Sequence, residues 1–139
     1  MRILSIDYGK KRTGIAVSDP LQIIANGLDT VETKNLEAFL KSYMEKEAVE
    51  TIVVGYPQQM NGEDSENMKR IAPFVNRLRK LYPDVRIEMY DERFTSVLAQ
   101  KAMLASGIGK KARQNKETVD KISATIILQD YMEYRQRTN

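Results

Sequence analysis

The sequence contains neither cysteine nor histidine, and these two absences exclude several kinds of active site. Without cysteine the chain has no disulfide bond, no thiolate nucleophile and no thiolate metal site. Without histidine it has no histidine general base, no Ser–His–Asp triad and no zinc site of the usual kind. Catalysis by this chain would therefore depend on carboxylates, lysine, tyrosine, hydroxyl groups or a hard metal ion.

Long apolar runs are also missing. No segment approaches the roughly 20 apolar residues that cross a bilayer, and the apolar run at residues 3–6 is too short for a signal peptide. We therefore expect a cytoplasmic protein that makes no membrane contact. The chain has 139 residues, of which 42% are hydrophobic, and this suits a single domain over 1–139 with a core of ordinary size.

The excess positive charge lies near the C-terminus. Residues 1–100 hold 14 lysines and arginines against 15 acidic residues, whereas residues 101–139 hold 8 against 4. The segment GIGKKARQNK at 107–116 carries four positive charges and no negative one. A basic segment punctuated by glycine is typical of a nucleic-acid contact, and a solubilising loop explains the same charge about equally well.

Apolar patterning predicts five strands and four helices. The strands are expected over 3–7, 13–19, 23–33, 51–57 and 86–94. The connections between the first three are short enough for an antiparallel meander. The helices are expected after a cap at Asn35, after a cap at Ser65, over 97–106 and over 118–136. This order predicts an α/β fold, with a five-stranded mixed sheet and helices on both faces.

Acidic side chains stand at the ends of predicted strands. Asp7 ends the first strand, and Asp91 and Glu92 lie at the end of the last one. Asp120 lies in the first turn of the last helix, on a stripe with Ala124, Ile127 and Tyr131 that is expected to face the sheet. If the first strand is central and parallel to the fourth and fifth, their carboxyl ends share one edge of the sheet, where ligands bind in α/β folds.

Three carboxylates from distant parts of the chain, without histidine, suit Mg²⁺ or Mn²⁺, which prefer oxygen ligands. Two such ions about 4 Å apart support phosphodiester hydrolysis. Each acid also has a simpler interpretation, since Asp7 suits a turn cap, Asp91 and Glu92 an exposed strand end, and Asp120 a favourable charge near a helix start. The combination of acids on one edge favours the metal site.

Basic residues near these acids would hold the phosphates of a substrate. Arg12, in the glycine-bounded turn at 9–14, and Arg93 are the candidates for the phosphate itself. The basic segment would contact the flanking backbone of the nucleic acid through Lys110, Lys111, Arg113 and Lys116. Lys10 and Lys11 contribute general electrostatic attraction. The turn is not a Walker A loop, because isoleucine follows its second glycine where that motif needs lysine.

Four segments resemble, in order and spacing, the motifs of the YqgF/RuvX family. They are DYGKKRTGIAVSD at 7–19, GYPQQMNG at 55–62, DERFTS at 91–96 and VDKISATIILQDYM at 119–132, which together span nearly the whole chain. The resemblance implies an RNase H-like fold and a metal-dependent nuclease acting in 5′-end processing of pre-16S rRNA during ribosome biogenesis. It also implies that Asp7, Glu92 and Asp120 are the catalytic, metal-binding acids, with Glu92 preferred over Asp91.

Two other functions stay open at this point. One is a Holliday-junction resolvase-like DNA nuclease, which would act as a dimer; such resolvases carry a further acid near the helical aspartate, where this chain has Ser123. The other is a non-catalytic RNA-binding assembly factor, which would have no use for acids beside phosphates. The expected partners are pre-rRNA or another structured nucleic acid, and the expected state is a monomer or a homodimer.

Overall fold

The computed structural model describes residues 1–56, 68–91 and 116–138, with the side chains of all of these but 116–119 and 138. Its centre is a five-stranded sheet in the order β3-β2-β1-β4-β5. The strands are β1 (Arg2–Asp7), β2 (Arg12–Ser18), β3 (Ala25–Glu32), β4 (Val49–Tyr56) and β5 (Arg86–Asp91). The pairs β1–β2 and β2–β3 are antiparallel, and β1–β4 and β4–β5 are parallel, which confirms the predicted mixed sheet.

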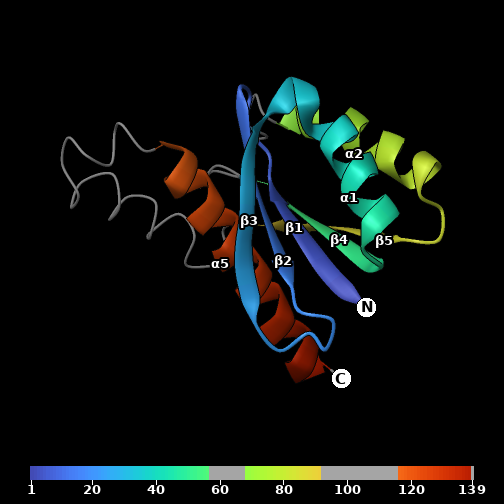
Figure 1. The fold of residues 1–139 in the computed structure, drawn as a ribbon, viewed down its shortest axis with the longest axis vertical. Helices are drawn as coiled ribbons and strands as arrows, with labels where there is room; N and C mark the ends of the chain where they lie inside the picture. The colour runs from blue at the N-terminus through green and yellow to red at the C-terminus, as the bar shows by residue number, and fades with distance from the viewer. Residues whose placement is uncertain (57–67, 92–115, 139) are drawn as a thin grey trace.

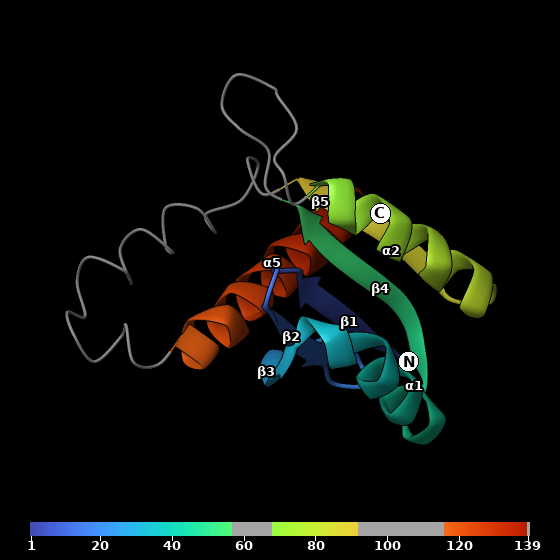
Figure 2. The same cartoon turned by 90° about the horizontal axis from the view of Figure 1, so that it is seen from above.

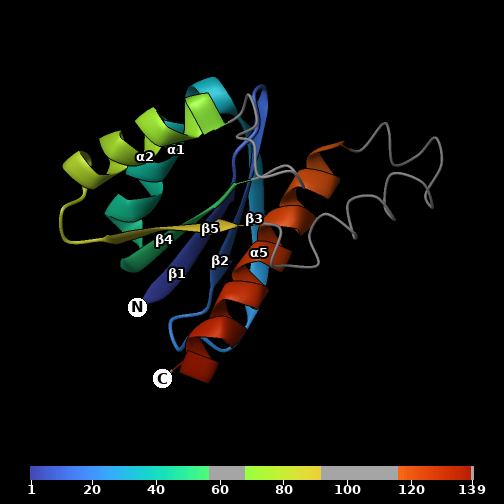
Figure 3. The ribbon, with the colours of Figure 1, turned by 180° about the vertical axis from the view of Figure 1, so that it is seen from behind.

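Helices cover both faces of this sheet (Figures 1 and 3). α1 (Leu36–Lys46) and α2 (Met68–Leu81) lie on one face, and the long α5 (Lys116–Thr138) lies on the other. Figure 2, seen from above, shows α5 crossing the strands at an angle. The two-sided cover explains why the central strands are apolar on both faces, since neither face meets water.

Two apolar cores follow from the alternation of side chains along the strands. Leu4 and Ile6 of β1 are fully buried in the core under α1 and α2. Ile3 of β1 and Val53 of β4 point the other way, into the core under α5. The α5 side of that second core is formed by Ala124, Ile127, Leu128, Tyr131 and Met132.

The end of β3 differs from the prediction. The strand spans Ala25–Glu32 rather than 23–33, and Thr33–Asn35 form a 3₁₀ turn, η1. Asn35 precedes α1 but makes no side-chain cap hydrogen bond, so the predicted cap is wrong. The reason is local, because the Leu36 N–H already donates to the Thr33 carbonyl of the 3₁₀ turn.

α5 begins earlier than predicted, at Lys116 instead of residue 118. Asp120 therefore lies beyond the first turn, where the field of the helix dipole has largely faded. A favourable charge at a helix start does not explain this acid. The stripe predicted to face the sheet is confirmed, because Ala124, Ile127 and Tyr131 are buried against it.

The predicted helix over 97–106 and the predicted cap at Ser65 lie outside the described residues. Among the helices that the structure describes, none has the length and apolar character needed to cross a membrane.

Candidate functional site

The carboxyl ends of the parallel strands β1, β4 and β5 share one edge of the sheet, as the element order predicted. Asp7 is the last residue of β1, and its side chain is largely buried, at 8% exposure. In the sheet it lies level with Gly14 of β2 on one side and Gly55 of β4 on the other. Both cross-strand neighbours lack a side chain, so the sheet itself leaves space beside the Asp7 carboxylate.

α5 approaches the sheet very closely at Gly14. A Cβ atom at this position would stand 2.0 Å from the carbonyl oxygen of Asp120 and 3.1 Å from the nitrogen of Lys121, so only glycine fits. The backbone of Asp120 is thereby placed beside the residue that pairs with Asp7. Two predicted metal ligands from opposite ends of the chain thus come to one corner of the sheet edge.

Two further contacts hold α5 in place along its length. The buried Ser5 hydroxyl donates a 2.6 Å hydrogen bond to the carbonyl oxygen of Ala124, one turn after Asp120. Further along, the Tyr131 hydroxyl donates to the carboxylate of Glu88 on β5. Burial of the phenol, and then its bond to Glu88, raise the pKa of Tyr131 above its ordinary value of 10.0, so this donor keeps its proton even in alkaline solution. The position of Asp120 is therefore set by packing and hydrogen bonds rather than by loop geometry.

Arg12, predicted to hold a substrate phosphate, contacts a predicted metal ligand in this structure. Its Nε donates to Oδ2 of Asp120 at 3.2 Å, and the two side chains are 35% and 26% exposed. An ion pair this accessible to water contributes at most about 1 kcal/mol to stability. The guanidinium is therefore able to leave Asp120 at little energetic cost when another cation or a phosphate competes.

The alternation of β5 separates Asp91 from Asp7. Met89 packs against the core under α1 and α2, whereas Tyr90 packs against α5. Asp91 follows the parity of Met89 and therefore points to the α2 side, while Asp7 lies on the α5 side. The preference for Glu92 over Asp91 stays a prediction, because Glu92 lies outside the described residues.

The donor set in this corner fits a hard cation as far as the structure describes it. Asp7 and Asp120 supply carboxylate oxygens, the ligands that Mg²⁺ and Mn²⁺ prefer. Ser123, on the same side of α5 as Asp120, is fully buried, and its hydroxyl has no hydrogen-bond partner among the described residues. Such an orphaned group costs about 1–3 kcal/mol, a cost that a polar ligand in this corner would relieve.

The described residues do not complete the predicted site. Among them, no three acidic side chains are placed to hold one metal ion. The third predicted ligand and most of the predicted phosphate contacts lie outside the described part of the chain, namely Glu92, Arg93, Lys110, Lys111 and Arg113. Lys116 is described by its backbone alone, as the first residue of α5.

Comparison with known proteins identifies the family. The RuvX family, described as Holliday junction resolvase, matches residues 1–134. This chain belongs to the RuvX family. Its RuvX relatives include proteins of Phocaeicola vulgatus, 64% identical over 97% of this chain and 97% of the relative, and of Bacteroides fragilis, 61% identical over 97% and 98%. The names of both relatives describe a pre-16S rRNA nuclease.

Solved structures show the same fold at much lower identity. The Holliday junction resolvase of fowlpox virus is 17% identical, with a TM-score of 0.54, over 96% of this chain and 99% of that chain. The same resolvase in complex with Holliday junction DNA gives a TM-score of 0.56 at 14% identity, over 96% and 98%. This likeness confirms the predicted RNase H-like fold for the RuvX chain.

The sequence analysis missed two features of this RuvX site. One is the pair of glycines that flank Asp7, Gly14 and Gly55, which the strand register alone reveals. The other is Lys34, which lies on the turn after β3 and joins the basic residues of the 9–14 turn. Pairing of Arg12 with Glu32 brings Lys34 close to this turn. Lys34 could have been predicted only from that strand register, which the sequence does not specify.

Proposed function

We propose that this RuvX chain is a metal-dependent nuclease that hydrolyses phosphodiester bonds in the 5′-end processing of pre-16S rRNA, in the cytoplasm. The observation that supports the proposal is the close approach of the Asp120 backbone to Gly14, the strand partner of Asp7, at a corner whose carboxylate oxygens suit a hard cation. The names of the relatives supply the substrate, since a nuclease site by itself does not specify an RNA.

The residues have distinct roles in this proposal. Asp7 and Asp120, together with Glu92, would hold Mg²⁺ or Mn²⁺. When bound, such an ion activates water and stabilises the charge that develops on the leaving oxygen. Arg12 stands next to Asp120 and would bind a phosphate oxygen of the RNA through its planar fork of donors. Flanking phosphates are assigned to the cations predicted for this purpose, Arg93, Lys110, Lys111, Arg113 and Lys116.

A cleavage assay with matched aspartate variants tests this function. The purified chain with Mn²⁺ or Mg²⁺ should cut an RNA that carries precursor sequence upstream of the mature 16S 5′ end. Asp7→Asn should abolish the cut, because it removes a charged metal ligand while preserving the shape of the side chain. Asp84→Asn is the control, since Asp84 is an exposed acid before β5 and is remote from the β1 carboxyl end. Cleavage that survives Asp7→Asn, or that needs no divalent ion, would refute the proposal.

The same assay decides which acid of the last strand acts. Glu92→Gln should abolish cleavage, whereas Asp91→Asn should retain it, because Asp91 follows the side of β5 that faces α2. The reverse result would show that Asp91, and not Glu92, completes the site.

The family description and the fowlpox virus neighbours favour a second candidate, a DNA nuclease that resolves four-way junctions. Such an enzyme would cut a synthetic four-way junction and spare a linear duplex of the same sequence. A chain that cuts precursor RNA and leaves the junction intact is the rRNA nuclease proposed above. A chain that binds RNA without any divalent ion, and for which Asp7→Asn is harmless in cells, is an assembly factor instead.

A further inference from the structure

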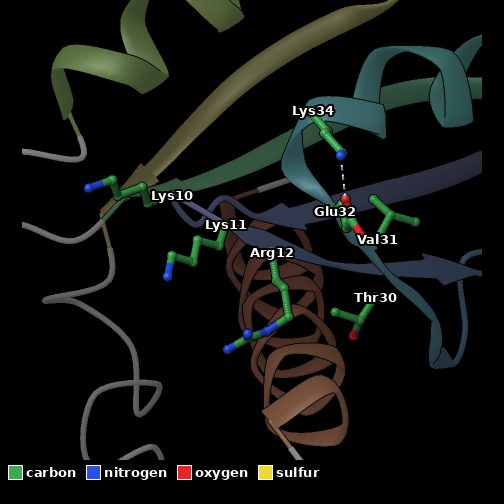
Figure 4. A pocket seen from close by; sticks show the side chains of 7 residues that line it. All are labelled: Lys10, Lys11, Arg12, Thr30, Val31, Glu32 and Lys34. Atoms are coloured by element: carbon green, nitrogen blue, oxygen red, sulfur yellow. Dashed lines mark ion pairs between the residues drawn. The ribbon is translucent and has the colours of Figure 1, made fainter.

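A basic groove borders the proposed metal site on the β3 side of the sheet. It encloses about 550 Å³ between the turn after β1, the end of β3 and η1. Figure 4 shows Lys10, Lys11 and Arg12 extending from the turn and the start of β2, with Lys34 on the opposite side. The lining residues, here called the basic groove, are Lys10, Lys11, Arg12, Thr30, Val31, Glu32 and Lys34.

Partly buried hydrogen bonds hold the two walls of the basic groove together. The Thr33 hydroxyl of η1 donates to the carbonyl oxygen of Gly9 at 2.6 Å, and its backbone N–H donates to the carbonyl oxygen of Lys11 at 2.9 Å. The hydroxyl of Thr13, which is fully buried, meets the Thr33 hydroxyl at 2.9 Å. The lysines therefore project from a braced backbone, so their spacing is a property of the fold and not of a loose turn.

The charge of the groove fits phosphate. Four of its seven side chains are cationic, and Glu32 is the single acid among them. Glu32 pairs with Lys34 at 3.2 Å, but both side chains are more than half exposed, at 62% and 78%. Such a pair is weak in water and leaves Lys34 able to bind an anion. The groove therefore presents a net positive surface next to Arg12, which in turn contacts the proposed metal ligand Asp120.

The composition of the groove also indicates which form of nucleic acid it would bind. Its seven lining side chains, all among the described residues, include no aromatic ring, whereas surfaces that bind single strands stack bases on aromatic rings. Lys10 and Lys34 also line a neighbouring pocket with Tyr8 and Phe74, but those two rings pack against each other and the core. Lysines that contact phosphates position a helix without reading its sequence. A surface of lysines without stacking platforms suits the paired backbone of a duplex rather than splayed bases.

We propose that the basic groove binds the sugar–phosphate backbone of a double-helical segment beside the cleavage point, without sequence preference. The placement relative to the cut rests on the proposed nuclease function. β3 is two strands away from β1, which is roughly 10 Å at the usual strand spacing. At about 3.4 Å per nucleotide along one strand, the β3 side of the groove, where Lys34 lies, would contact a phosphate about three nucleotides from the one that Arg12 holds at the metal site.

Binding measured without divalent ions tests the groove separately from cleavage. The probes are short fluorescein-labelled RNA and DNA duplexes of one arbitrary sequence and their separate single strands, titrated in EDTA over a range of salt concentrations. The double variant Lys11→Ala/Lys34→Ala should weaken binding to both duplexes. For each phosphate that the variant no longer neutralises, the slope of log K against log salt should fall by about 0.9 on B-form DNA. Lys41→Ala, in an exposed lysine of α1, is the control and should change neither quantity.

The outcomes separate the groove from the nuclease. An unchanged salt slope in the double variant, or an equal change in Lys41→Ala, would refute the proposal that the basic groove binds the nucleic-acid backbone. A larger loss of affinity on the single strand than on the duplex would overturn the assignment to a double helix. If the slope falls as expected but no precursor RNA is cut, the groove stands and the nuclease proposal fails. If RNA is cut in an Asp7-dependent way while the slope does not move, the nuclease stands and the groove fails.

Discussion

Replacing Gly14 with alanine is the sharpest test of how the fold builds the site. In an ordinary strand this change would stabilise the chain by about 0.5–1 kcal/mol, because glycine loses more backbone freedom on folding. Here the new Cβ would stand 2.0 Å from the Asp120 carbonyl oxygen, and real Cβ contacts essentially never fall below 3.0 Å. Either β2 or α5 must therefore move by about 1 Å or more. The clash is with backbone atoms of α5, so rotation of a side chain cannot relieve it.

The movement has a cost in stability and a cost in activity. Overpacking of a well-packed contact costs about 1–3 kcal/mol, and a clash with backbone lies at the upper end of that range. We therefore expect Gly14→Ala to lower the free energy of unfolding by about 2–3 kcal/mol, against the direction that strand propensity predicts. A displacement of about 1 Å between catalytic groups costs about 100-fold in rate, so cleavage by the remaining folded protein should fall by about that factor.

Gly27→Ala is a matched control, because it too adds a methyl group between a strand and α5, here β3 instead of β2. Its Cβ would meet Cγ of Lys121 at 2.6 Å and Oγ1 of Thr125 at 3.2 Å, which are side-chain atoms. The lysine stem has free rotamers and can turn aside, so we expect a loss below about 1 kcal/mol and normal cleavage. Urea unfolding followed by circular dichroism measures the stability, and the precursor RNA assay measures the rate. Equal losses in the two variants, or a Gly14→Ala chain as stable as the parent, would refute the reasoning.

Two further predictions concern single side chains. Arg12→Ala should change the free energy of unfolding by less than about 1 kcal/mol, because the pair with Asp120 is solvent-accessible, while calorimetry should show tighter Mn²⁺ binding once the competing cation is removed; weaker Mn²⁺ binding would contradict this. Tyr131→Phe tests the raised pKa of Tyr131: the folded chain keeps the phenolic proton after the unfolded chain has lost it, so stability is lost as pH rises above about 10. The variant should show a shallower loss in urea unfolding at high pH, and an identical slope would argue against the bond to Glu88.

Much of this molecule follows from local patterns in the sequence. The alternating and continuous apolar runs predicted all five strands, because side-chain burial in a sheet has a period of two residues or covers both faces. The stripe through Ala124, Ile127 and Tyr131 predicted the buried side of α5, because helical spacing brings those positions together. The element boundaries were less accurate, as at Asn35, since a 3₁₀ turn and a side-chain cap satisfy the same backbone groups.

Some features of the candidate site likewise follow from the sequence, and others depend on the tertiary structure. The sequence alone determined that acids stand at the ends of strands, that no histidine or cysteine competes for the chemistry, and that oxygen ligands must serve any metal. Only the tertiary structure decided that the backbone of Asp120 lies against Gly14, the strand partner of Asp7, that Arg12 contacts Asp120, and that Lys34 lines the same groove as the turn at 9–14. Each of these contacts joins segments far apart in the chain. Such contacts depend on strand register and on how closely a helix approaches a sheet, and local residue patterns do not encode either of these quantities.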